Sequence, residues 1–254
     1  IAYTGVNAGM VIGVADDAGM HSSQNEQDSR HYAKASKIPM LEPADSREAI
    51  EFTKLAFELS EKFDTPVLLK MCTRVSHSQS VVETSERIEV KKDYEKNGAK
   101  YIMMPGNAKR RHPIVEERLA KLSEYAESAS FNVFEDGEDK SIGIITSSTS
   151  YQYVKEVLGD KHPVLKLGMV WPLPVESIKK IASSVEKLVV VEELDGVVGQ
   201  EYAQASADIT FTEGENSADE GETDEPAESD EVTGETESTP AITDDDKPTE
   251  NSNR

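Results

Sequence analysis

Residues Ala15 to Arg30, ADDAGMHSSQNEQDSR, concentrate side chains that could bind a ligand. They follow MVIGVADD, an apolar run that predicts a buried strand of a parallel sheet. In open parallel sheets, ligands bind beyond the carboxyl ends of the strands. Ser23 and Glu26 match a capping box, which predicts a helix that starts at Ser23 and offers free N–H groups to a carboxylate or phosphate. The candidate cofactor- or substrate-cleft residues of this segment are Asp16, Asp17, His21, Ser22, Gln24, Asn25 and Arg30.

Each of these residues also has a purely structural explanation. Capping alone accounts for Ser23 and Glu26, and two aspartates can cap backbone N–H groups of a turn. A histidine in a surface loop is commonly a solvated side chain. Arg74 and His77 are further cleft candidates because they follow the third predicted strand, although a solvated loop explains them equally well. No residue is assigned a catalytic or a metal-binding role.

Three weaker features could also carry function. Residues 109–112, Lys-Arg-Arg-His, form a basic cluster that could contact an acidic partner or a cofactor phosphate, or could simply be solvated. Glu192 and Glu193 follow the last predicted strand as a carboxylate pair, which solvation also explains. Cys72, the one cysteine, lies in the apolar run PVLLKMC and is expected to be a buried, inert thiol in a reducing, cytoplasmic compartment.

Strands and helices alternate in the first 80 residues. After the strand that ends at Asp17, KIPMLEP predicts a second strand, and PVLLKMCTRV predicts a third. Between them, Asp45 and Glu48 form another capping box, followed by apolar residues at helical spacing that predict a helix to about Lys62. This order predicts a parallel sheet covered by helices.

The rest of the sequence predicts three further regions. Residues 81–139 read as a polar connection between domains with one helix, from about Ile114 to Ser128. Residues 140–204 predict a small βαβαβ unit with strands SIGIITSS, HPVLKLGMVWP and KLVVVEE and a following helix in VVGQEYAQAS; a unit of this size needs a neighbour to bury its core. Residues 205–254 are rich in acidic and small polar residues, which predicts disorder.

The charge belongs mainly to that last region. The whole chain of 254 residues has a net charge of −22, and the residues from Asp208 to Arg254 carry −15 of it. Neither part has the basic stripe that nucleic-acid binding requires, so neither nucleic acid nor an anionic membrane is an expected partner. We find no phosphate-binding Walker loop, no GxGxxG, no HExxH and no GxSxG, which disfavours an independent NTPase, dinucleotide enzyme, zinc protease or serine hydrolase.

The stretch GMVIGVADDAGMHSSQNEQDSRHYAKASKIPMLEPADSREA, with EKFDTPVLLKMCTRVSHS after it, resembles the large (alpha) subunits of indolepyruvate:ferredoxin oxidoreductases. These subunits belong to the thiamine-diphosphate-dependent ketoacid:ferredoxin oxidoreductases. The segments VLKLGMVWPLP and VVVEEL resemble the transketolase C-terminal-like domain of the same subunit. The resemblance covers about residues 1–200, and Ala18 stands where the family pattern has proline.

The resemblance implies a fold and a reaction. Residues 1–80 would form part of a pyrimidine-binding domain, with the loop from Asp16 to Arg30 near the cofactor and substrate cleft at a subunit interface. The reaction would be oxidative decarboxylation of an aryl pyruvate to an aryl-acetyl-CoA, with coenzyme A as acceptor and ferredoxin taking the electrons. The implied partners are the remaining part of the large subunit and a smaller beta subunit.

Several parts of the family pattern are not found in the sequence. These are the Gly-rich loop and activating glutamate expected before Ile1, the Gly-Asp-Gly of the diphosphate-binding domain, and the cysteines of the [4Fe-4S] clusters. We therefore expect an internal fragment, inactive alone, that binds thiamine diphosphate and Mg²⁺ only with the missing domain. Two alternatives remain: a subunit of a sibling pyruvate or 2-oxoacid oxidoreductase, and a non-catalytic scaffold derived from this fold.

Overall fold

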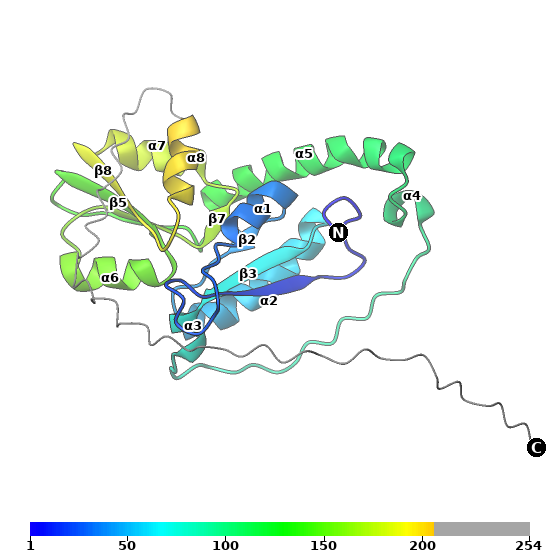
Figure 1. Ribbon diagram of the computed structural model, residues 1–254, viewed down its shortest axis with the longest axis horizontal. Coiled ribbons are helices and arrows are strands. Elements are labelled where there is room, and N and C mark those ends of the chain that lie inside the picture. Colours follow the sequence, from blue (N-terminus) through cyan, green and yellow to red (C-terminus); the bar gives the residue numbers. More distant parts are fainter. Residues whose placement is uncertain (206–254) are drawn as a thin grey trace, which may run out of the picture. The chain divides into compact units, whose positions relative to one another are not determined.

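Two four-stranded sheets, each covered by helices, form the fold in the computed structural model, which describes residues 1 to 205 (Figure 1). Both sheets are mainly parallel, as the alternation of strands and helices predicts. The mixed α/β fold class is therefore confirmed. The acidic region predicted to be disordered lies outside the described residues.

The first sheet has the strand order β1-β3-β2-β7. Strand β3 pairs in parallel with both β1 and β2, whereas β7 pairs with β2 in the antiparallel direction. The carboxyl ends of β1 and β3 therefore lie at the same edge of the sheet. The elements of this part are β1 (Val11–Asp16), α1 (Arg30–Ser36), β2 (Met40–Leu41), α2 (Ser46–Phe63), β3 (Val67–Cys72), α3 (Thr73–His77) and β7 (Met169–Trp171).

The second sheet has the order β4-β6-β5-β8, with β4 as an antiparallel edge strand. Its elements are β4 (Val133–Glu135), β5 (Ile142–Ser147), α6 (Ser148–Leu158), β6 (Val164–Leu167), α7 (Val175–Ser183), β8 (Lys187–Val191) and α8 (Val197–Ala205). Helices α4 (Gly98–Tyr101) and α5 (Pro105–Ser128) precede it. None of the described helices combines the length and the apolar character that crossing a lipid bilayer requires.

The chain passes from the second sheet to the first at Gly168. The run HPVLKLGMVWP, predicted as one strand, divides there into β6 and β7, and this prediction was wrong in its continuity. A Cβ atom at Gly168 would lie 2.6 Å from the carbonyl oxygen of Phe131 and 2.8 Å from the ring of Phe52. Only glycine therefore lets the backbone pass between these residues.

The two sheets share a hydrophobic core. One cluster joins Met40 and Leu68 of the first sheet to Ile145 and Leu165 of the second, with Ile178 of α7 packed among them. This shared core supplies the burial that a βαβαβ unit of about 65 residues lacks by itself.

Helix α2 forms where the sequence predicts it. The Asp45 side chain accepts a hydrogen bond from the Glu48 N–H (2.9 Å), and the Glu48 carboxylate accepts one from the Ala44 N–H (2.8 Å). Such a cap stabilises a helix by about 1 kcal/mol. The helix buries Phe52 and Leu59 against the first sheet.

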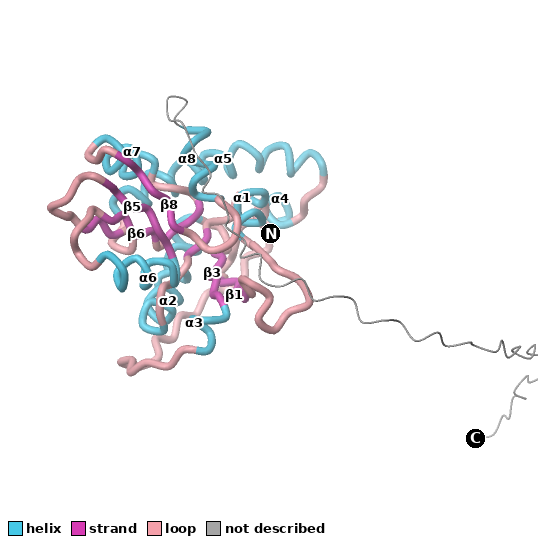
Figure 2. The backbone as a smooth tube through the Cα atoms, turned by 60° about the vertical axis from the view of Figure 1, so that its left-hand side comes forward, coloured by secondary structure: helices cyan, strands magenta, loops and turns pink. Residues whose placement is uncertain are grey.

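Other predicted boundaries differ from the structure. The helix predicted to start at Ser23 starts at Arg30, and residues Thr73–His77, partly predicted as strand, form the short helix α3. The stretch 81–139, predicted to contain one helix, contains α4, a longer α5 that begins at Pro105, and strand β4. Between α3 and α4 the chain runs as one long loop without helix or strand, which Figure 2 draws entirely as loop.

Candidate functional site

Two adjacent aspartates at the end of β1 fix the loop that follows. Asp16 is 2% exposed and accepts hydrogen bonds from the N–H (2.8 Å) and the hydroxyl (2.6 Å) of Ser29. Asp17 accepts from the N–H groups of Ser22 (2.6 Å) and Ser23 (2.7 Å). The middle of the loop and its far end are thereby both held at the end of β1.

Asp17 also connects β1 to the residue that follows β3. The hydroxyl of Thr73 donates to Asp17 at 2.5 Å. This bond, with the one from the Ser22 N–H, holds the pKa of Asp17 well below its usual range, because each stabilises the carboxylate form. Asp17 is therefore an ionised anchor for the loop.

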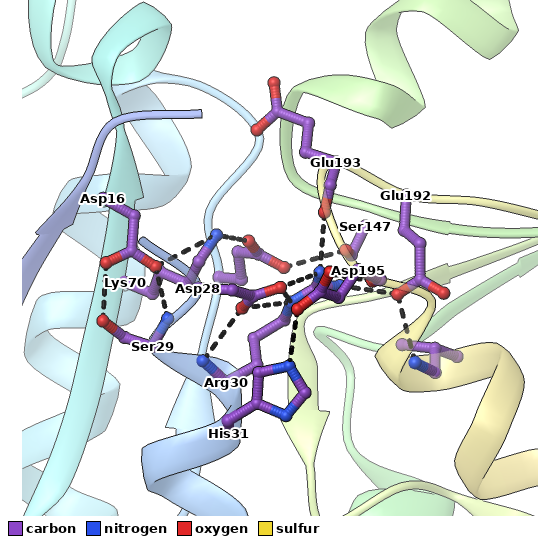
Figure 3. Close-up of polar contacts among 12 residues, drawn as sticks. Asp16, Asp28, Ser29, Arg30, His31, Lys70, Ser147, Glu192, Glu193 and Asp195 are labelled. Atoms are coloured by element: carbon purple, nitrogen blue, oxygen red, sulfur yellow. Dashed lines mark hydrogen bonds and ion pairs between the residues drawn. The ribbon is translucent and has the colours of Figure 1, made fainter. Parts of the chain in front are cut away.

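Arg30, the first residue of α1, connects the loop to the second half of the fold (Figure 3). Its guanidinium, 2% exposed, binds Asp28 through Nε and Nη2 and donates to Oε2 of Glu192 at 2.5 Å. It also donates to the carbonyl oxygens of Glu193 (2.6 Å) and Asp195 (2.7 Å). Burial acts to lower the pKa of Arg30, but the hydrogen bond with Asp28 and the surrounding carboxylates raise it, so the group stays charged.

The Glu192 carboxylate accepts hydrogen bonds both from a guanidinium and from the N-terminus of a helix. Besides binding Arg30, its carboxylate accepts from the N–H groups of Val198 (3.1 Å) and Gly199 (3.2 Å), in the first turn of α8. Burial raises the pKa of Glu192, and Arg30 together with these N–H groups opposes the rise. One carboxylate thus connects α1 to the start of α8.

A buried ion pair lies beside this cluster. The ammonium of Lys70 in β3 binds Oε1 of Glu42, and both side chains are 2% exposed. Ser147, at the end of β5, donates its hydroxyl to Oε2 of Glu42 at 2.8 Å, and Asp16 lies 3.9 Å from the ammonium. Burial would raise the pKa of Glu42, but Lys70 and Arg30 hold it below its usual value, so the pair is ionised.

The network continues across the strand ends of the second sheet. Thr149 donates to Oε1 of Glu193 at 2.8 Å, and the Cys72 sulfur lies 3.7 Å from the Thr149 hydroxyl. Cys72 is 2% exposed, which confirms the predicted buried thiol. The carboxyl ends of strands from both sheets are therefore joined by one continuous set of polar contacts.

The structure divides the predicted cleft residues into three groups. Asp16, Asp17 and Arg30 lie inside the buried network, where they hold the loop in place. The tip of the loop is exposed and contains His21, Ser22, Gln24 and Asn25. Arg74 and His77 lie on α3, also exposed, with the Arg74 guanidinium 5.5 Å from the ring centre of Tyr153.

Reasoning from the sequence missed Lys70, Glu42 and Ser147. The signal was a charged residue within each of two apolar runs, Glu42 in KIPMLEP and Lys70 in PVLLKMC. A charge in a buried strand needs a partner, and two such strands predict that the charges pair. Glu192 and Glu193 were noticed, but not as ligands of Arg30.

The basic cluster on α5 is used partly within the chain. Arg111 donates to the carbonyl oxygen of Tyr3 (2.7 Å) and to Asp64 (3.2 Å), and His112 Nδ1 lies 2.7 Å from the Tyr3 hydroxyl. These contacts attach the first residues of the chain to α5.

The described residues do not by themselves fit a diphosphate with its Mg²⁺. The one group of metal-ligand type among them is Asp28, His31 and Asp195, whose ligand atoms lie within 4.8 Å of one another. Asp28 is already bound by Arg30, and His31 by Asp195 at 2.8 Å. The described residues therefore do not form a complete binding site for this cofactor.

Most of the chain is similar in sequence to part of several known proteins. No family profile matches the chain. The subunit IorA of indolepyruvate oxidoreductase from Methanothermobacter marburgensis is 42% identical over 207 residues, which is 79% of this chain and 34% of the relative. The IorA of Archaeoglobus fulgidus is 41% identical over 203 residues, 78% of this chain and 32% of the relative.

A solved structure shares the fold. The 2-oxoglutarate:ferredoxin oxidoreductase of Magnetococcus marinus superposes with a TM-score of 0.57 at 15% identity, covering 80% of this chain and 45% of that chain. The chain spans about a third of the length of the curated relatives. Over the matched residues it is similar to the indolepyruvate oxidoreductase subunits IorA.

Proposed function

We propose that this chain supplies part of the large subunit of a 2-oxoacid:ferredoxin oxidoreductase that acts on aryl pyruvates such as indolepyruvate. The main support for this proposal is the sequence identity of about 40% with IorA subunits over 79% of the chain. In the proposed reaction the 2-oxoacid loses CO₂, its acyl group is transferred to coenzyme A, and two electrons pass to ferredoxin. The alternative substrate class is another 2-oxoacid.

The role of the described residues is to position one wall of the cleft. Asp16, Asp17 and Arg30 are fully engaged in internal contacts, so they hold the loop rather than a ligand. The exposed loop tip, with His21 and Asn25, is free to contact substrate or cofactor. The loop therefore presents polar groups to a cleft that the remaining part of the large subunit and a smaller beta subunit complete.

The proposed cofactor, thiamine diphosphate with Mg²⁺, is bound only with that remaining part. When bound, it supplies the carbanion chemistry that decarboxylation of a 2-oxoacid requires. We assign the diphosphate ligands and the [4Fe-4S] clusters to the remaining part, because the single cysteine here is buried and no described ligand set is free for a metal-bound diphosphate. By itself the chain is proposed to be inactive.

Calorimetric titration with thiamine diphosphate and Mg²⁺ tests the proposal. The chain is titrated alone and then with the remaining part of a relative's large subunit supplied as a separate polypeptide. Binding that requires both pieces supports a cleft assembled between them. No binding in either case, from a chain with a cooperative unfolding transition, contradicts the proposal and favours a scaffold.

Variants of the loop tip test its contribution in the reconstituted complex. His21→Ala and Asn25→Ala are expected to lower ferredoxin reduction by at least tenfold with the unfolding transition unchanged, because both side chains are exposed. Lys121→Ala, an exposed change on α5, is the matched control. Comparing indolepyruvate with pyruvate and 2-oxoglutarate then distinguishes the aryl branch from its siblings.

A further inference from the structure

Asn97 and Gly98 form the one Asn-Gly pair of the sequence, and both are exposed at the start of α4. In such a pair the backbone nitrogen of the glycine can attack the side-chain amide carbon of the asparagine, because the glycine has no side chain to block the approach. The new C–N bond closes a succinimide ring, and ammonia leaves. Water then opens the ring to aspartate or isoaspartate, with no oxidation or reduction.

The backbone nitrogen of Gly98 is available for this attack. Gly98 is the first residue of α4, so its N–H has no acceptor within the helix. Among the residues that the structure describes, no other group accepts a hydrogen bond from it. The space beside Gly98 is open, since a Cβ placed there would meet only the end of the Ile102 side chain, at 3.4 Å.

The capped helix holds the two reacting atoms apart. Asn97 is the N-cap of α4: its side chain accepts a hydrogen bond from the Lys100 N–H at 3.0 Å, and its ψ angle is 89°. At this angle the Cβ of Asn97 and the nitrogen of Gly98 lie nearly on opposite sides of the Cα–C bond. Ring closure therefore requires rotation about this bond, which breaks the cap.

Helix α4 has few contacts that resist this rotation. It consists of four residues, none of them buried, and a helix this short is marginal in water. The Lys100 ammonium attaches it to the rest of the fold by donating to Asp64 (2.7 Å) and to the Val6 carbonyl (2.8 Å). The Asn107 side chain donates to the Ile102 carbonyl at 2.8 Å. Segments with so few buried contacts open at low free-energy cost.

We propose that Asn97 is a site of spontaneous deamidation and that the opening of α4 sets its rate. In the isoaspartate product the main chain runs through the former side chain, so the residue no longer caps α4. Lys100 then loses its fixed position beside Asp64, a carboxylate that also accepts the Val6 N–H at 2.9 Å. A covalent change that accumulates with time therefore loosens the attachment of α4 to the first residues of the chain.

Peptide mapping by mass spectrometry measures the reaction in the full chain at neutral pH, and an isoaspartyl methyltransferase labels the isoaspartate product. The native chain is expected to deamidate at Asn97 at least tenfold more slowly than the chain unfolded in urea, because only the open form of α4 reacts. Gly98→Ala is expected to slow the reaction of the unfolded chain at least tenfold. A native rate equal to the unfolded rate overturns the proposal. So does the absence of product in the native chain after the unfolded chain has reacted completely.

Lys100→Met tests whether the opening of α4 sets the rate. It removes both contacts of the Lys100 ammonium, so the native rate is expected to rise at least threefold while the rate in urea stays unchanged. Asn107→Ala, which removes the hydrogen bond to the Ile102 carbonyl, is expected to act in the same direction. Lys109→Met, at an exposed position of α5, is the matched control and should change neither rate. Native rates of both variants equal to that of the control contradict the proposal.

Discussion

Removing one partner of the Lys70–Glu42 pair should strongly destabilise the fold. Lys70→Met keeps the length of the side chain but deletes the ammonium, leaving the buried Glu42 carboxylate without its ion-pair partner. Its remaining partners would be the Ser147 hydroxyl at 2.8 Å and the charge of Arg30. Breaking a buried ion pair in this way costs roughly 3–5 kcal/mol. Reversible urea unfolding of the full chain measures the loss.

The same variant has a predictable pH dependence. Without Lys70, burial should raise the pKa of Glu42 above its unfolded value. A group whose pKa is higher in the folded state contributes its full stability to the fold below its unfolded pKa. That contribution is lost as the pH rises through the folded pKa. The difference in unfolding free energy between Lys70→Met and the wild type should therefore become smaller as the pH falls from about 7 to about 5, because Glu42 of the variant is then protonated.

Two control variants test whether the loss comes from the unpaired buried charge. Lys121→Met breaks an exposed pair of α5, with Glu117 at 2.7 Å, and should leave the unfolding free energy nearly unchanged, because solvent screens the pair. Glu42→Gln/Lys70→Met removes both charges and should recover at least half of the loss. A cost for Lys70→Met close to that of the exposed control, or no recovery in the double variant, would refute the argument that a buried charge is left unpaired.

Three further predictions concern the loop and the crossing between sheets. Arg30→Lys should lower the unfolding free energy by about 2–4 kcal/mol, because an ammonium cannot make the fork of hydrogen bonds, and should speed hydrogen exchange in the loop from Asp17 to Ser29. Gly168→Ala should cost about 1–3 kcal/mol in urea unfolding, because its Cβ meets a backbone carbonyl at 2.6 Å. Thr73→Val should raise the pKa of Asp17 in a carboxyl NMR titration, so that the stability from this carboxylate is lost at a higher pH as the pH falls.

Each of these has a matched control. Arg47→Lys changes an exposed arginine and should leave stability nearly unchanged. Gly106→Ala adds a Cβ where no atom lies within 4 Å, and it should not destabilise. Thr53→Val removes a hydroxyl that donates to the Ala49 carbonyl, and it should leave the pKa of Asp17 unchanged. Equal effects of a variant and its control would contradict the corresponding prediction.

Local signals predicted most of the helices and strands. The capping box at Asp45 and the apolar spacing behind it gave α2 correctly, because a helix end is determined by residues three positions apart. The box at Ser23 gave a wrong helix start, because the Ser23 N–H binds Asp17 and the Glu26 carboxylate binds the Gly19 N–H, instead of binding each other as in a capping box.

Long-range contacts were beyond such signals. The charges in two apolar runs indicate that Glu42 and Lys70 pair, but no local pattern indicates that Arg30 reaches Glu192, which lies 162 positions away. The switch of sheets at Gly168 is likewise invisible in a continuous apolar run. The candidate site was therefore predicted by its position at strand ends, and its buried partners were not.

The antiparallel strand β7 has a consequence for chimaeras made from two homologous chains with this fold. Met169–Trp171 completes a sheet whose other strands come from the first 72 residues, and Glu192 supplies a ligand to Arg30. A chimaera joined anywhere in residues 78–97, where the sequence looks most permissive, would combine one parent's strands with the other parent's edge strand and carboxylate. Functional crossovers should therefore exchange residues 11–72 together with 169–199.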